Sequence, residues 1–218
     1  YEIKECDWSS DVCSSDLAGL AMSLARPGGN VTGFPGSEPT APGKWLSLLR
    51  DLAPRAHKVI VIFAPENPIN DEYWSVITET ARNFGIATTR FDFDASLLDA
   101  RLSSAADETS ALLVLPGPST NNNHPKIVAA AATRALPAVY PFEFYARAGG
   151  LLAYGPDQTE IIRGAAGYVD RILRGDKPGD LPIQLPMRYR TVINLKTAKA
   201  QGLTIPTMLL ATADEVIE

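Results

Sequence analysis

Short, wholly apolar runs alternate with helical stretches through the middle of this chain of 218 residues, and this alternation constrains the fold most strongly. The two clearest runs are Val59–Phe63 and Ala111–Leu115. A strand that is apolar on both sides belongs in a parallel sheet covered by helices on both faces. Residues 73–84 and 125–134 instead have the apolar spacing and the end signals of helices. The sequence therefore predicts alternating strands and helices.

Further elements continue this order along the central part of the chain. We expect strands at 87–93, 138–140 and 151–154, helices at 44–52 and 96–104, and a short helix or turn at 142–148. Strands that alternate with helices of this length pair in parallel through right-handed crossovers. The predicted fold class is therefore α/β, with a doubly wound parallel sheet.

The segments on either side of this sheet are too small to bury a face alone. Before it we expect a helix at 18–26, stopped by Pro27-Gly28-Gly29, and a short extended piece at 30–34. After it we expect helices at 161–174 and 195–201 and a strand at 189–194. These segments are predicted to bury less surface than the central sheet.

Composition argues against nucleic acids and anionic membranes as partners. The formal net charge of -5 disfavours a nucleic acid or an anionic membrane, either of which would favour a basic patch. No apolar run approaches the roughly 20 residues of a membrane span. The start of the chain also lacks the basic and apolar regions of a signal peptide.

The first 17 residues differ from the rest of the chain. They contain a near-repeat of Ser-Ser-Asp at 9–11 and 14–16, and both cysteines, Cys6 and Cys13. The cysteines could form a disulfide or part of a metal site, but zinc requires four ligands and no histidine is near. The alternative is a non-native leader at residues 1–17, which we favour.

Three segments in order carry a resemblance to one family. Residues 24–34 read LARPGGNVTGF, residues 138–157 read AVYPFEFYARAGGLLAYGPD, and residues 192–206 read VINLKTAKAQGLTIP. Together they resemble the substrate-binding proteins of bacterial ABC importers, in the branch of tryptophan-type binding proteins. The resemblance covers residues 18–218 and implies a type I periplasmic-binding-protein fold, in which two α/β lobes share the chain.

The resemblance also implies a domain organisation. Residues 48–154 would form one complete lobe, and residues 18–47 and 155–218 would be remnants of the first lobe and the hinge crossings. Because family members are about half as long again, we expect the chain to be a C-terminal fragment. The family implies export to the periplasm or cell envelope, a small-molecule solute in the cleft between lobes, and an ABC permease as partner.

Ligands of open parallel sheets collect outside the carboxyl ends of the strands. The loops expected there combine neutral hydrogen-bonding groups, flat apolar surface and carboxylates, including Glu66, that could accept an ammonium group. This mixture suits an amino acid or a similar small organic molecule. The candidate ligand-binding residues are Pro65, Asn67, Gly117, Ser119, Thr120, Tyr140, Phe142, Tyr154 and Asp157.

Structural roles compete with these assignments. Tyr140 and Phe142 could pack beneath the sheet edge. Asp157 could cap the following helix, because Asp-Gln-Thr-Glu is a capping pattern. Asn67 could be a turn residue. The segment Arg26–Asn30 resembles a phosphate loop only superficially, because it lacks the Gly-x-x-x-x-Gly-Lys spacing.

Enzymatic patterns are weak. His57 and His124 are the only histidines, and no Gly-x-Ser-x-Gly elbow accompanies them. We expect His124 to be a solvated loop residue, and Trp45 and Trp74 to be packing residues. The sequence shows no metal-ligand spacing, and we expect no cofactor and no enzymatic activity. The alternatives are a small enzyme or a sensory ligand-binding domain on a flavodoxin-like sheet.

Overall fold

A computed structural model of the chain describes residues 21–36 and 40–218. These residues form two compact units. The larger unit comprises residues 40–155 and 190–218, and the described part of the smaller unit comprises 21–36 and 156–189. The predicted leader at 1–17, with both cysteines, lies outside the described residues.

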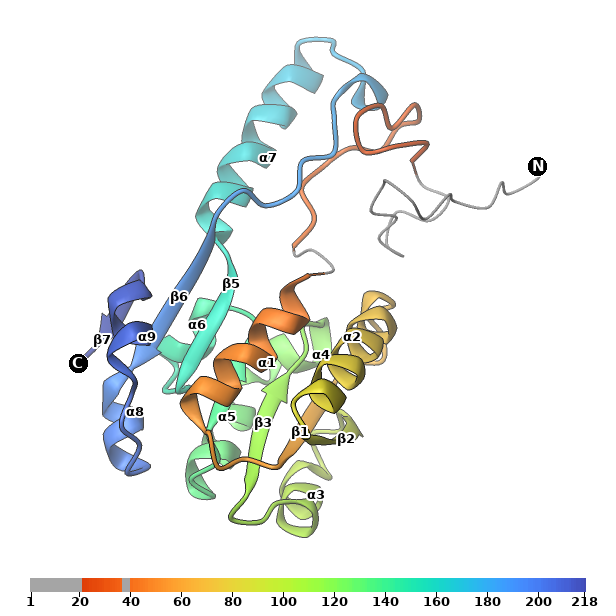
Figure 1. Cartoon of the computed structure of the whole chain (residues 1–218). Coiled ribbons are helices and arrows are strands. Elements are labelled where there is room, and N and C mark those ends of the chain that lie inside the picture. The colour runs from red at the N-terminus through yellow and green to blue at the C-terminus, as the bar shows by residue number, and fades with distance from the viewer. Residues whose placement is uncertain (1–20, 37–39) are drawn as a thin grey trace. The chain divides into compact units, whose positions relative to one another are not determined.

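Helices and strands alternate along most of the described chain (Figure 1). In order they are α1 (Ala41–Leu52), β1 (Lys58–Phe63), α2 (Ile69–Asn83), β2 (Ala87–Asp92), α3 (Leu98–Ala105), β3 (Ser110–Val114), α4 (Pro118–Asn122), α5 (His124–Thr133), β4 (Ala138–Tyr140), α6 (Glu143–Arg147), β5 (Leu152–Pro156), α7 (Gln158–Leu173), η2 (Pro178–Asp180), β6 (Tyr189–Asn194), α8 (Leu195–Ala200), α9 (Thr207–Thr212) and β7 (Glu215–Ile217).

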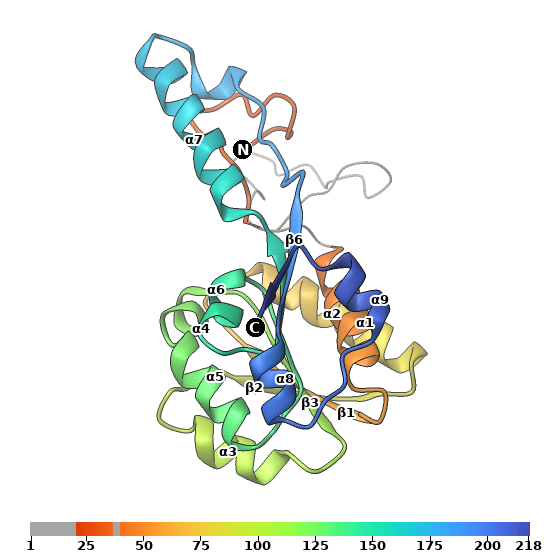
Figure 2. The same cartoon turned by 90° about the vertical axis from the view of Figure 1, so that its left-hand side faces the viewer.

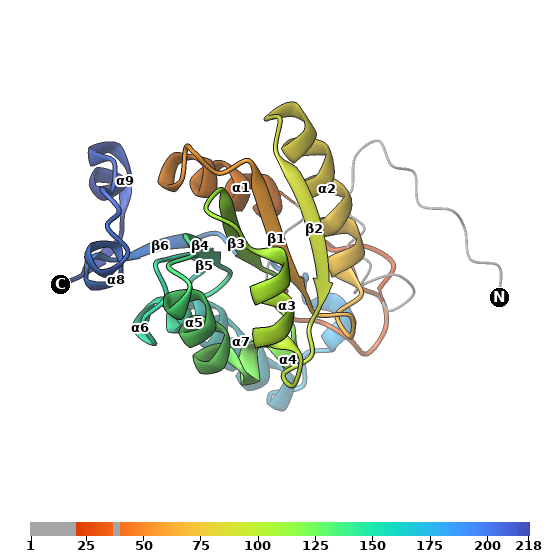
Figure 3. The ribbon, with the colours of Figure 1, turned by 90° about the horizontal axis from the view of Figure 1, so that it is seen from below.

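The strands form a 7-stranded sheet in the order β2-β1-β3-β4-β5-β6-β7. Strand β1 is parallel to both of its neighbours, and Val61 lies opposite Arg90 of β2 and Leu113 of β3. Seen from below, α1 and α2 cover one face of the strands β1, β2 and β3, and α3 and α5 lie on the other (Figure 3). This arrangement confirms the predicted α/β class.

The core explains why β1 is apolar from Val59 to Phe63. Ile60 and Ile62 belong to a buried cluster with residues of α3 and α5, including Leu98 and Ile127. The alternate residues of β1 are equally buried, with Val61 at 0% exposure. Because successive side chains of a strand point to opposite faces, both faces of β1 are covered.

The smaller unit is built around α7, which Figure 2 shows as one long helix. The Phe34 ring lies 4.8 Å from the Tyr168 ring of α7, and the Tyr168 hydroxyl donates to the Pro182 carbonyl at 2.7 Å. Main-chain hydrogen bonds join residues 24–33 to residues 183–184. The segment before α1 and the segment after α7 are therefore parts of one unit.

Two local predictions are wrong. Residues 21–26 of the expected helix at 18–26 are not helical, because the Leu24 carbonyl instead accepts a hydrogen bond from the Ile183 N–H at 2.7 Å. The loop expected after β3 contains the short helix α4, with Pro118 at its first position. Proline suits that position because its missing N–H would have no helical partner there.

The two units do not follow the boundaries expected from sequence. Residues 40–47 and 190–218 belong to the larger unit. Trp45 of α1 is 1% exposed in the core of the larger unit, and Val192 and Ile193 of β6 are 0% exposed there. Arg190 also pairs with Glu143 of α6. Strand order and burial thus tie these segments to the central sheet.

Helix α7 is apolar over a wider arc than the described part of its own unit covers. Tyr168 is buried, but Ile162, Val169 and Leu173 are 67%, 56% and 82% exposed. Spacings of seven and four residues place these three side chains on one side of the helix. The expected lower burial of the outer segments is therefore observed for α7, but it is wrong for β6, whose last four residues are buried.

Candidate functional site

The loops after β1 and β3 meet at the carboxyl ends of these strands. A Cβ atom at Gly117 would lie 2.3 Å from the Ala64 Cβ, so only glycine permits this approach. The Asn67 side-chain amide donates to the Pro116 carbonyl at 2.9 Å. The segments after β1 and β3 are therefore in direct contact. They carry the candidates Pro65, Asn67 and Gly117 and, in the short helix α4, Ser119 and Thr120.

Two residues outside the candidate set hold these loops together. The Ser119 N–H donates to Glu66 Oε1 at 2.7 Å. The fully buried Asn70, in the first turn of α2, donates from Nδ2 to the carbonyls of Ala64 and Pro116 at 2.9 and 3.0 Å. A polar residue in the first turn of a helix is an ordinary pattern, so no sequence signal marked Asn70 as the link.

The environment of Glu66 favours its charged form. Partial burial acts to raise the pKa of Glu66, but hydrogen bonding to Ser119 and to its own N–H outweighs burial and lowers the pKa. The Ser119 hydroxyl is close enough to help lower the pKa of Glu66, although it makes no hydrogen bond of normal geometry. Glu66 is therefore a carboxylate at neutral pH.

Thr120 and Tyr140 have contacts that serve the core. The Thr120 hydroxyl is fully buried and donates to the carbonyls of Leu115 and Gly117. Tyr140 is 1% exposed and stacks on Tyr145 at a ring separation of 5.0 Å. Burial, with a smaller effect of Tyr145, raises the pKa of Tyr140 far above its ordinary value. The packing role considered for Tyr140 is confirmed.

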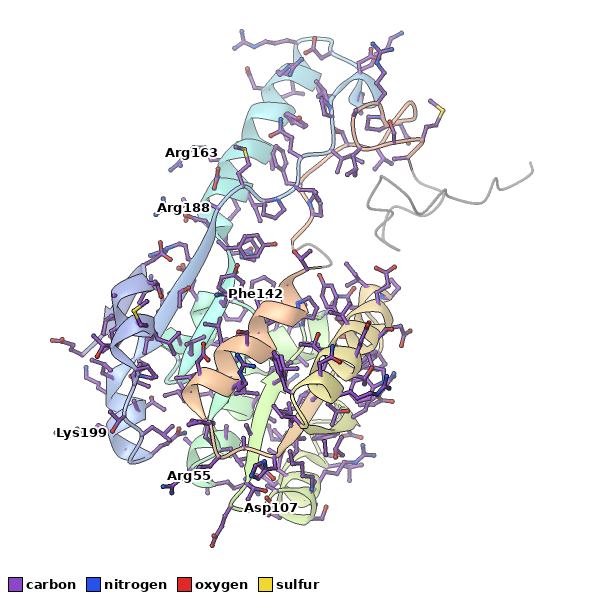
Figure 4. All side chains as sticks on the ribbon, in the orientation of Figure 1. Arg55, Asp107, Phe142, Arg163, Arg188 and Lys199 are labelled. Carbon is purple, nitrogen blue, oxygen red and sulfur yellow. The ribbon has the colours of Figure 1, made fainter. Side chains whose placement is uncertain are left out.

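Phe142 and Tyr154 lie near the end of the larger unit that carries these loops. Phe142 precedes α6 and stacks on Phe144 at 5.6 Å. Figure 4 shows Phe142 at the opposite end of the larger unit from Arg55 and Asp107. Tyr154 is half-buried, and its carbonyl accepts a hydrogen bond from Trp45 Nε1 at 2.7 Å. Phe142 is largely buried, so only a small part of its ring faces solvent.

His124 is not a solvated loop residue, contrary to the prediction. It is the first residue of α5 and is half-buried. Its ring lies 4.9 Å from Phe144 and 5.5 Å from Tyr145, and Nδ1 lies 2.8 Å from the Asn121 carbonyl oxygen. The ring is therefore a packing group within an aromatic cluster.

Asp157 belongs to the smaller unit, whereas the other candidates belong to the larger one. Its carboxylate accepts hydrogen bonds from the N–H groups of Thr159 and Glu160 at 3.0 and 3.3 Å. This confirms the predicted capping of the helix. Asp157 also lines a cavity of about 250 Å³ between α7 and residues 184–188 of its own unit, whose rim includes Arg163 and Arg188 (Figure 4).

A second cavity lies at the amino ends of the strands, away from the candidate loops. It has a volume of about 640 Å³ and is lined by the loops around Arg55, Asp107 and Arg134 and by residues 202–204. Residues 21–36 and 40–218 contain no group of three or more His, Cys, Asp or Glu side chains placed to hold a metal ion. Within the same ranges, no helix combines the length and apolarity needed to cross a membrane.

Comparison with known proteins identifies a relative by sequence and solved structures with a similar fold. The chain is 25% identical over 185 residues to a tyrosine-binding protein of Clostridioides difficile, and the match covers 84% of this chain and 53% of that relative. A conserved domain protein of Vibrio cholerae superposes with a TM-score of 0.82 at 24% identity, over 92% of this chain and 67% of the other. An ABC domain from Streptococcus pneumoniae, in complex with L-Trp, gives 0.80 at 22% identity, over 93% and 70%.

The structural likenesses show the fold, which is that of type I periplasmic binding proteins. The chain spans about half the length of the curated relative, 53%. Residues 11–217 match the family model described as ABC transporter substrate binding protein. This match begins within the segment expected to be a leader and covers nearly all of the rest. The chain therefore belongs to the ABC transporter substrate-binding protein family.

Proposed function

We propose that this chain is part of the solute receptor of an ABC importer, and that it binds an amino acid or a similar small organic molecule. The observation that carries the proposal is the pair of interlocked loops at the carboxyl ends of β1 and β3, on a chain of this family. The names of two relatives, one tyrosine-binding and one in complex with L-Trp, support an amino acid as the solute.

The candidate residues divide into two roles in this proposal. Asn67, Ser119, Phe142 and Tyr154 would contact the solute, with Pro65 at the rim. Three buried candidates would instead hold the loops in position from the protein core: Gly117, Thr120 and Tyr140. Asp157 belongs to the smaller unit, where it caps α7. Loops already fixed by hydrogen bonds lose little conformational freedom when a ligand binds.

The proposed mechanism contains no chemical step, and the protein would not be an enzyme. Solute binding would favour a closed arrangement of two lobes over an open one, and the closed form would dock on a membrane permease. The full-length protein would therefore work outside the cytoplasmic membrane, in the periplasm or cell envelope. The family supports this mode of action.

Ligand screening tests the proposal directly. We expect L-tyrosine or L-tryptophan to raise the melting temperature, because a ligand that binds only the folded state stabilises it. The screen would include the twenty amino acids and common organic acids, on this chain and on a version extended by a complete first lobe. Folded protein without a shift in either version would contradict the proposal.

We also propose that the smaller unit is a remnant of a first lobe, whose other part would cover α7. Replacing Val169 and Leu173 by lysine should then change the free energy of unfolding of this chain by only about 0.5 kcal/mol or less, because both side chains are exposed. The matched control is Tyr168→Ala on the buried side, with an expected loss of about 3 kcal/mol. Urea unfolding measures both, and a large loss in the lysine variant would show that the stripe is already covered.

A further inference from the structure

We infer that Glu66 recognises a protonated amine on the solute. The inference rests on the proposed function and adds a chemical class to it: the solute carries a primary ammonium group, and Glu66 is its acceptor. The candidate residues of the larger unit all have neutral side chains, so none of them supplies the negative charge that would bind an ammonium group.

One hydrogen bond of normal geometry anchors the Glu66 carboxylate. Oε1 accepts the Ser119 N–H at 2.7 Å. The Ser119 hydroxyl and the Glu66 N–H lie near enough to lower the pKa of this carboxylate, and no described lysine or arginine forms an ion pair with Glu66. Glu66 is exposed, so its carboxylate can accept a further hydrogen bond from an external donor, and among the described residues no cation neutralises its charge.

Contacts of the neighbouring residues position the anchor before a ligand arrives. The absent side chain of Gly117 leaves room for the carboxylate, since a Cβ atom there would lie 3.1 Å from Glu66 Oε1. Asn67 and Asn70 fix the Pro116 carbonyl from the same side. A preset carboxylate can form a charge-assisted hydrogen bond with an ammonium group at a small ordering cost.

The negative charge of Glu66 favours an ammonium group over a carboxylate beside it. An anionic group beside Glu66 would meet like charge, whereas an ammonium group would meet opposite charge. A neutral hydroxyl could bond to Oε2, but without the charge its bond would be weaker. An amino acid should therefore bind with its ammonium group at Glu66 and its carboxylate elsewhere.

The experiment compares amino acids with analogues that lack only the amine. The probes are L-tyrosine and L-tryptophan against 3-(4-hydroxyphenyl)propionate and indole-3-propionate, with Kd measured by NMR titration of the whole chain. We expect wild type to bind the amino acids about tenfold more tightly or better, the effect of one charge-assisted hydrogen bond. Glu66→Gln should abolish this preference, and it can still accept the Ser119 N–H through its amide oxygen.

Two controls separate charge and folding effects. Glu79→Gln, an exposed position on α2, changes the net charge equally and should keep the preference. Glu66→Asp keeps the charge on a shorter side chain and should retain a partial preference. Without any ligand, the Ser119 amide signal should titrate with a midpoint below the ordinary pKa of a glutamate, because Ser119 lowers the pKa of Glu66.

Each outcome decides one proposal. If wild type binds amino acids and Glu66→Gln binds them equally well, or if wild type does not distinguish the analogues, the receptor function stands and the inference about Glu66 is wrong. If the Ser119 amide signal does not respond to the pH titration, the hydrogen bond between the Ser119 N–H and Glu66 is absent. The inference then fails whatever the ligand measurements show. If wild type binds none of the probes, the inference about Glu66 fails, whereas the wider screen of this chain and its extended version decides the proposed function.

Discussion

Replacing Trp45 by alanine should lower the free energy of unfolding of the larger unit by about 3–5 kcal/mol, the range for removing a large buried aromatic side chain. Trp45 is 1% exposed, and its ring meets Tyr73 edge-on at 5.6 Å. Its Nε1 donates to the Tyr154 carbonyl at 2.7 Å, so the variant also removes this hydrogen bond. Urea unfolding followed by circular dichroism measures the loss.

Two further variants divide this effect into its parts. Trp45→Phe keeps most of the ring contact but removes the donor, and should lose about 1–2 kcal/mol. Trp74→Ala removes a ring of the same kind from a half-buried position on α2 and should cost less than Trp45→Ala. A loss in Trp45→Ala no larger than in Trp74→Ala would show that Trp45 does not join α1 to the core.

The core of the larger unit could be predicted because its signals are local. The apolar runs at Val59–Phe63 and Ala111–Leu115 match β1 and β3 to within one residue at each end. A strand buried on both faces cannot tolerate a polar side chain without a partner, so burial appears directly in the sequence. The rule that ligands gather at the carboxyl ends of strands then selected loops that do contact one another.

Contacts between distant residues could not be predicted in the same way. The segment at 21–26 has helical composition, but the chain there bonds to residues about 160 positions away. Glu66 and Ser119, and Asn70 and Pro116, are joined across two strands, and no local pattern records such pairs. For the same reason the sequence could not tell that Thr120 and His124 are held by their neighbours.

Gly155→Ala should also destabilise the larger unit strongly, with an expected loss of about 3 kcal/mol or more, at the upper end of overpacking effects. A Cβ atom at this position would lie 1.8 Å from the Pro141 carbonyl oxygen and 3.5 Å from Phe142 Cδ1. The first of these is a main-chain atom, so no side-chain rotation relieves the clash. Either β5 or the segment between β4 and α6 must move.

This prediction gives a physical reason for the motif Tyr154-Gly155-Pro156-Asp157, in which the glycine permits two adjacent parallel strands to end in close contact. The matched control is Gly43→Ala in α1, where an added Cβ meets nothing within 4 Å. It should stabilise the larger unit by about 0.5–1 kcal/mol, because alanine is the better helix former. Urea unfolding of both variants gives the comparison, and the Phe142 ring signals in NMR should shift in Gly155→Ala alone. Equal stability of the two variants would mean that Gly155 and Pro141 lie farther apart than the contact requires.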